Sequence, residues 1–109
     1  MKEKLPDFLE KVIAEYPDVW KAYQDLGDAS SKAGPLDEKT VRLVKLAIAI
    51  GAQSEGAVHS HARRALKLGV TREELQQVAL LAVTSIGWSS SMAALSWIQD
   101  VTDKRAEKS

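Results

Sequence analysis

Apolar residues recur along this chain at intervals of three and four, the spacing that gathers them on one side of an α-helix. No stretch alternates apolar and polar residues with period two, so no strand is expected. The N-terminal part predicts two short helices, over residues 5–15 and 17–26, and Pro17 suits the first position of the second. The Ser-, Ala- and Gly-rich segment 27–34 indicates a weak helix end or a loop.

Further helices are expected over residues 38–52 and 55–68. Asp37 is a good N-cap for the first of them. Apolar residues cover most of the circumference of helix 38–52, which is typical of a central helix that contacts neighbours on several sides. Gly69 suits the C′ position, just after the end of helix 55–68.

The C-terminal part predicts two more helices. Thr71-Arg72-Glu73-Glu74 has the form of a capping box and begins the fifth helix. Gly87 interrupts the apolar pattern, and one of the three serines 89–91 is expected to cap the last helix. The polar tail 102–109 is expected to fray. The pattern as a whole predicts an all-α fold, a compact bundle of about six helices.

The amino-acid composition excludes several classes of function. The length of 109 residues predicts a single domain. The chain carries 15 basic and 15 acidic side chains, and this balance excludes nonspecific electrostatic binding to nucleic acid. Apolar runs reach only six residues, too few for a membrane span, and the start of the chain lacks the apolar core of a signal peptide, so a cytoplasmic location is expected. Because the chain has no cysteine, disulfides, thiolate metal sites and thiol chemistry are excluded.

Both histidines lie in the helix expected over 55–68, on different faces. At 100° per residue His59 and His61 diverge by about 160°, so one helix cannot direct both rings at one metal ion and no metal site is expected. His59, one turn after Glu55, is interpreted as half of an exposed pair, with a catalytic or metal role as the alternative. His61 lies on the apolar face, either as a hydrogen-bonded core or interface residue or as an active-site acid/base.

Three further residues are candidates for substrate binding. Ser54 shares the face of His61 and either caps its helix or lines a site. Arg42, one turn after Glu38, either forms a surface ion pair or binds a substrate carboxylate through the N–H donors of its guanidinium. Trp88 stands at a helix break and either packs in the core or forms a pocket wall.

Residues 61–75, His-Ala-Arg-Arg-Ala-Leu-Lys-Leu-Gly-Val-Thr-Arg-Glu-Glu-Leu, resemble a segment of the carboxymuconolactone decarboxylase family, which includes the alkylhydroperoxidase D-like proteins. The resemblance extends over about 36–95, and His61 stands eight residues before Gly69 as the family's histidine does. It implies an alkylhydroperoxidase D-like helical fold for the single domain 1–109. Residues 1–35 are then N-terminal helices and a loop, residues 36–101 the family core, and residues 102–109 the tail.

The peroxidase branch of this family carries the pattern Glu-x11-Cys-x2-Cys-x3-His. Counted back from His61, the two cysteine positions fall on Ala57 and Ser54, and the glutamate position falls on Arg42. Only His61 therefore carries over, and the dithiol that would cycle through a disulfide is missing.

The decarboxylase branch has no need of cysteine. The resemblance implies a cofactor-free decarboxylase, or a related lyase or isomerase, acting on a small carboxylate or lactone. His61 would deliver a proton, Arg42 would hold a carboxylate, and Ser54 and Trp88 would contact the substrate. The alternative is a non-catalytic scaffold or ligand-binding relative that kept the fold. The family also implies a homotrimer or homohexamer, with no nucleic-acid or membrane partner.

Overall fold

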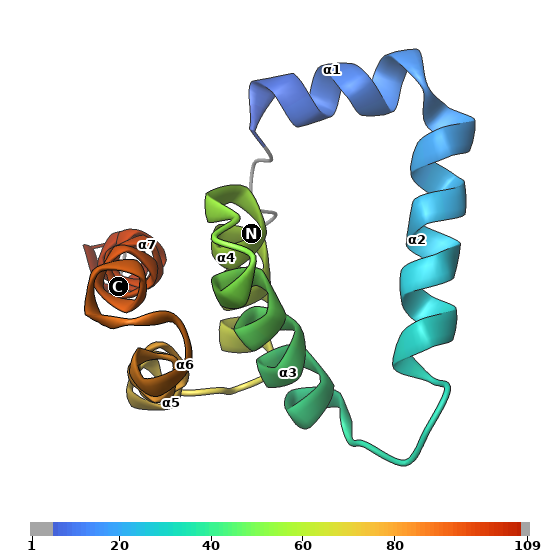
Figure 1. Ribbon diagram of the computed structural model, residues 1–109. Coiled ribbons are helices and arrows are strands. Elements are labelled where there is room, and N and C mark those ends of the chain that lie inside the picture. The colour runs from blue at the N-terminus through green and yellow to red at the C-terminus, as the bar shows by residue number, and fades with distance from the viewer. Residues whose placement is uncertain (1–5, 108–109) are drawn as a thin grey trace. The chain divides into compact units, whose positions relative to one another are not determined.

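The computed structural model describes residues 6–107, and the regular elements within that range are α-helices (Figure 1). The all-α prediction is thereby confirmed. The chain divides into two units, residues 1–35 and 36–109, which are described in turn. None of the described helices has both the length and the apolar character needed to cross a membrane.

The first unit holds α1 (Asp7–Glu15) and α2 (Pro17–Ser31), with Pro17 in the first turn of α2 as expected. The predicted start of the first helix at residue 5 lies outside the described residues. Of the two alternatives for residues 27–34, a helix end is present in the first part, because α2 continues to Ser31, five residues beyond its predicted end. The hydroxyl of Ser30 donates to the carbonyl of Gly27 at 3.0 Å, so the serine side chain bonds back onto the helix that contains it.

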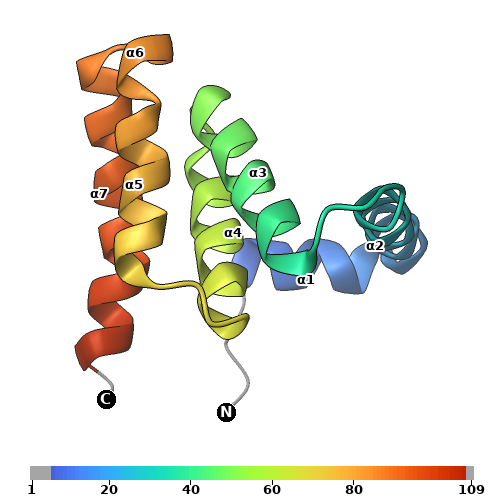
Figure 2. The same cartoon turned by 90° about the horizontal axis from the view of Figure 1, so that it is seen from below.

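The second unit contains the remaining helices: α3 (Glu38–Gly51), α4 (Glu55–Lys67), α5 (Arg72–Leu81), the single turn α6 (Val83–Ile86) and α7 (Trp88–Glu107). Helix α4 packs on α3 and α7, while α5 packs on α7 and α3 (Figure 2). Their buried faces form one apolar core, whose largest fully buried side chains are Leu46, Ile50, Val58, Leu75 and Ile98.

Two of the predicted helix N-termini are capped as the sequence indicates. The carboxylate of Asp37 accepts from the backbone N–H of Thr40 at 2.8 Å, and this backbone hydrogen bond holds the pKa of Asp37 below its usual value. At the start of α5, Thr71 Oγ1 accepts from Glu74 N at 3.1 Å, and Glu74 Oε1 accepts from Thr71 N at 2.8 Å. The capping box is therefore complete, and the bond from Thr71 N–H lowers the pKa of Glu74.

Helix α3 is less enclosed than its sequence predicts. Leu46, Ala49 and Ile50 are buried, but Val44 is exposed and Ile48 keeps 65% of its surface accessible. The predicted contacts with several neighbours are present, since α3 packs against α4 and α5, but within the second unit these two helices cover only part of its apolar circumference. An apolar strip of α3 is left uncovered by the second unit.

Helix α7 differs from its prediction at both ends. It begins at Trp88, directly after Gly87 (φ 90°), whose carbonyl accepts from the N–H of Ser91 at 3.2 Å. The serines 89–91 therefore lie inside the first turn, and the prediction that one of them caps the helix is wrong. Fraying from residue 102 is also wrong as far as residue 107, because Thr102 is buried on the bundle. Residues 108–109 of that tail lie outside the described part.

Candidate functional site

Arg42 on α3 and His61 on α4 meet side by side. The guanidinium Nη1 of Arg42 lies 2.8 Å from Nδ1 of His61. Arginine has only N–H donors, so Nδ1 must accept, and the hydrogen of the neutral ring is then on Nε2. The two residues are 19 positions apart in the sequence and are brought together by the packing of α3 on α4.

This environment keeps His61 uncharged. Its pKa falls from 6.5 to about 4, first because the half-buried ring loses hydration, and then because Arg42, Arg64 and Lys45 repel a positive charge on it. A histidine with this pKa is a neutral imidazole at pH 7. The three cations leave a positive field that favours an anion near the ring.

His61 also lines a pocket of about 260 Å³ between α3 and α4. The walls are mostly apolar, with polar atoms supplied by a lysine, a serine and the imidazole. The lining residues are Lys45, Ile48, Ala49, Ala52, Ser54, Ala57 and His61. A mainly apolar pocket with a few convergent polar groups is typical of a site for a small ligand.

The positions singled out by the family pattern converge on this pocket. Ser54 and Ala57 line it, and Arg42 contacts the His61 ring that forms part of its wall. Ser54 occupies the N-cap position of α4, but its side chain makes no capping hydrogen bond. Its hydroxyl is therefore not engaged by the helix start, and the residue lines the pocket.

Lys45 is a site residue that was not among the predicted binding residues. It lies three residues after Arg42 on the same stripe of α3 and lines the pocket. The signal was present in the sequence, since a helix brings residues three apart to one face. The sequence alone did not show that this face of α3 points toward the pocket.

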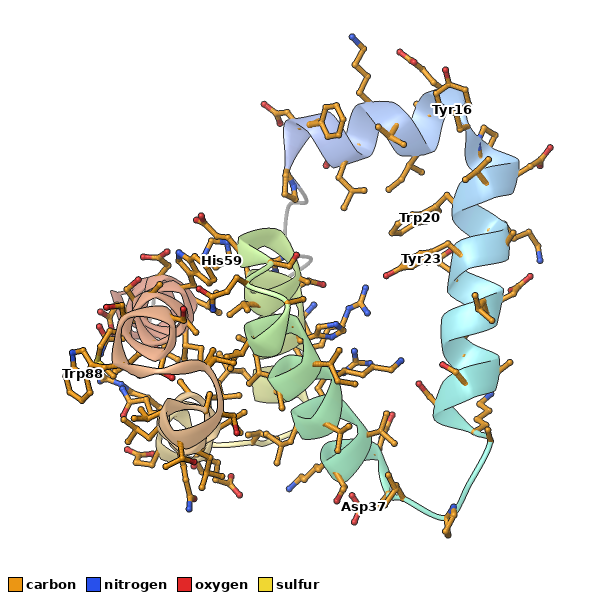
Figure 3. The ribbon with its side chains drawn as sticks, viewed as in Figure 1. Tyr16, Trp20, Tyr23, Asp37, His59 and Trp88 are labelled. Atoms are coloured by element: carbon orange, nitrogen blue, oxygen red, sulfur yellow. The ribbon has the colours of Figure 1, made fainter. Side chains whose placement is uncertain are left out.

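Trp88 does not join this site. It lies at the start of α7, points away from the bundle and keeps 67% of its surface exposed (Figure 3). The core-packing interpretation is therefore wrong. Trp88 is also not among the residues that line the pocket beside His61, so its role in binding remains a prediction without support from this geometry.

A larger cavity of about 560 Å³ lies between α3 and the α5–α6 segment. Its lining is apolar apart from a few side chains such as Thr40, Gln77 and Glu74, and Glu74 is already engaged in the capping box. It offers no histidine and no arginine. Of the residues that line these two pockets, the imidazole of His61 belongs to the smaller one.

His59 faces a different helix from His61. Its Nε2 lies 3.0 Å from Oδ2 of Asp100 on α7 and 3.9 Å from Oε2 of Glu55 on its own helix. The predicted proximity to Glu55 is present, but the shorter contact is to Asp100. Sequence spacing gave no signal for Asp100, which is 41 residues away.

Comparison with known proteins points to one family. The model of the carboxymuconolactone decarboxylase family matches residues 17–100. A crystal structure of an apo carboxymuconolactone decarboxylase family protein from Legionella pneumophila superposes with a TM-score of 0.73 and 30% identity, covering 88% of this chain and 85% of that one.

Two curated relatives are uncharacterised proteins. One, from Methanocaldococcus jannaschii, is 29% identical over 102 residues, which span 93% of this chain and 95% of the relative. The other, from Haemophilus influenzae, is 39% identical over 51 residues, which span 47% of this chain and only 45% of the relative.

Proposed function

Because the chain belongs to the carboxymuconolactone decarboxylase family, we propose that it binds a small carboxylate or lactone in the pocket beside His61 and acts on it as a cofactor-free decarboxylase or related lyase or isomerase. The chain has no cysteine, so it cannot run a dithiol peroxidase cycle. The chemistry must then come from His61 and the cations around it.

The contact between Arg42 and His61 carries this proposal. It places a guanidinium and an imidazole at 2.8 Å beside a pocket that also contains Lys45 and Ser54. An anionic ligand would gain Coulomb energy from the cations and hydrogen bonds from the serine hydroxyl and imidazole N–H. The apolar walls, such as Ile48, would cover the rest of a small organic molecule.

A decarboxylation at this site needs two kinds of assistance. The C–C bond to the carboxylate breaks, CO₂ leaves, and the electron pair stays on the substrate as an enolate that the positive field stabilises. The carbon then takes up a proton. An anion bound beside His61 offsets the repulsion from Arg42, Lys45 and Arg64 and raises the pKa of the imidazole. If the anion also takes over the hydrogen bonds of the Arg42 guanidinium, Nδ1 is released and can take a proton from solvent, and the imidazolium then gives its Nε2 proton to carbon and is left neutral with the hydrogen on Nδ1.

The alternative is a relative that binds the same ligands without turning them over. The low pKa of His61 favours it, because a histidine with a pKa of about 4 is a poor proton donor at pH 7. The two functions share the binding step and differ in whether His61 is needed for a reaction or only for contact.

The test separates binding from turnover. Thermal shift against small mono- and dicarboxylates and γ-lactones reports binding, and CO₂ release or loss of lactone absorbance reports turnover. Arg42→Met should weaken the thermal shift, while His61→Gln should keep it and abolish turnover. Arg72→Met, which removes an exposed arginine of α5 from its contact with Asp103, is the matched control and should match wild type. Turnover that persists in folded His61→Gln contradicts the catalytic proposal, and ligand binding with no turnover in wild type favours the alternative.

We also propose that the chain self-associates, as a homotrimer or homohexamer. Apolar side chains are exposed on α3 and α5 of the second unit, including Ile48, Leu80 and Leu81. Large apolar side chains exposed in this number are typical of a subunit interface. Light scattering after gel filtration tests this, and a monomer at micromolar concentration contradicts it.

A further inference from the structure

Three side chains with metal-ligating atoms converge where α4 packs on α7. Glu55 and His59 lie one turn apart on α4, and Asp100 comes from α7. One ligand atom from each lies within 4.8 Å of the other two. In Figure 3 the His59 ring lies on the side of α4 that faces α7.

We propose that Glu55, His59 and Asp100 form a binding site for a Zn²⁺-type divalent transition-metal ion. The site would join α4 to α7. It is independent of the proposed function, because His61 and its pocket lie between α4 and α3.

The distances suit such an ion. Zn²⁺ binds imidazole nitrogen and carboxylate oxygen at about 2.0–2.2 Å, which separates the ligand atoms of a tetrahedral site by about 3.4 Å. His59 Nε2 lies 3.0 Å from Oδ2 of Asp100 and 3.9 Å from Oε2 of Glu55, on either side of that value. Moderate rotation of the two carboxylates is enough to surround an ion bound at Nε2.

The three ligating side chains differ in how far they are exposed. The side chain of His59 is 25% exposed, whereas those of Glu55 and Asp100 are 57% and 51% exposed. The imidazole is therefore held by the contact between the helices, and the carboxylates can adjust to the ion. The exposed side of the cluster leaves a coordination position for water, as in zinc sites with three protein ligands.

The ligand set also selects the class of ion. Ca²⁺ and Mg²⁺ prefer all-oxygen sites, whereas one imidazole with two carboxylates favours Zn²⁺, Co²⁺ and similar ions. A neighbouring carboxylate on α7 has a different partner, since Asp103 lies 3.7 Å from Arg72. Asp100 thus belongs to the His59 cluster, and Asp103 provides a carboxylate of the same helix outside it.

The test titrates tag-free protein with ZnCl₂ by calorimetry and with CoCl₂ by visible absorbance. Wild type should bind one equivalent of each ion per chain, and MgCl₂ should give no binding. His59→Gln and Asp100→Asn should each weaken binding by about tenfold or more. Asp103→Asn and His61→Gln are the matched controls and should bind as wild type does.

Several results would overturn the site. These are no Zn²⁺ or Co²⁺ binding to wild type, unchanged binding in His59→Gln, or equal loss in the control variants. If circular dichroism shows that His59→Gln is unfolded, Glu55→Gln takes its place, since Glu55 is exposed in the first turn of α4 and is not part of the core. The experiment measures cation binding alone, so its result does not depend on whether His61 supports turnover.

Discussion

Nη1 of Arg42 lies 2.8 Å from Nδ1 of His61, and this contact sets the tautomer of the imidazole and adds to the desolvation that keeps the ring uncharged. Resemblance to the family's peroxidase branch would place a glutamate at position 42. A carboxylate there would favour the imidazolium, whereas the guanidinium favours the neutral ring. An arginine at that position thus reverses the sign of the charge beside His61.

The first prediction concerns the charge of residue 42. Arg42→Glu should raise the pKa of His61 by about one unit or more, because a repelling cation becomes an attracting carboxylate. The ring ¹⁵N shifts of His61 across a pH titration measure this. Lys67→Glu makes the same charge change on α4, at a residue that does not contribute to lowering the pKa of His61, and should leave it unmoved. An unchanged pKa in Arg42→Glu would show that the charge of residue 42 does not contribute to it.

The second prediction concerns stability and pH. The pKa of His61 is about 4 in the folded protein and about 6.5 when unfolded, so between these pH values the unfolded chain binds more protons. The contribution of His61 to the free energy of unfolding is therefore lost as pH falls from 6.5 to 4 and changes little below. Urea denaturation across that range should show a shallower pH dependence in His61→Gln than in wild type. Parallel curves for the two proteins would contradict a lowered pKa.

Local structure could be predicted where the residues that decide it are neighbours in the chain. The cap at Asp37 and the capping box at Thr71 involve bonds over three residues, and both form as expected. Helix ends were predicted less well where tertiary contacts override propensity. The end of α7 is an example, since buried Thr102 and the contact of Asp103 with Arg72 accompany a helix that composition suggested would fray.

The candidate site could be predicted only in part, for the same reason. His61 and Ser54 share one helix face, so their common location followed from the period of the helix. The contact of Arg42 with His61 depends on how α3 packs on α4, which spacing does not encode. Asp100 was missed altogether, because its partner His59 is 41 residues away on another helix.

The third prediction tests the capping box of α5. Thr71→Ala should lower the free energy of unfolding by about 1 kcal/mol, since it removes the hydroxyl that accepts from Glu74 N–H. Glu73→Ala removes an acidic side chain from the same turn without breaking either bond of the box. It should cost only a few tenths of a kcal/mol, through the helix dipole. Equal losses in the two variants, measured by urea denaturation, would count against the box.

The fourth prediction concerns the turn between α6 and α7. Gly87 has φ 90° and ψ 167°, a region open almost only to glycine. Gly87→Ala should therefore destabilise the protein by about 1–3 kcal/mol, although an added Cβ would meet no atom within 4 Å. Gly56→Ala, at a helical glycine of α4 with equally open surroundings, should raise stability by about 0.5–1 kcal/mol. A Gly87→Ala protein as stable as wild type would rule out this backbone constraint.

We expect the pocket beside His61 to receive a small organic anion. The most direct measurement is the pKa of His61, read from its ring ¹⁵N shifts with and without each small carboxylate of the panel at saturating concentration. A bound carboxylate should raise this pKa from about 4 toward 6.5, because it offsets the field of Arg42, Lys45 and Arg64, and the shifts of His59 should stay unchanged. A pKa of His61 that stays near 4 with every carboxylate, or a change that His59 shares equally, would contradict the claim.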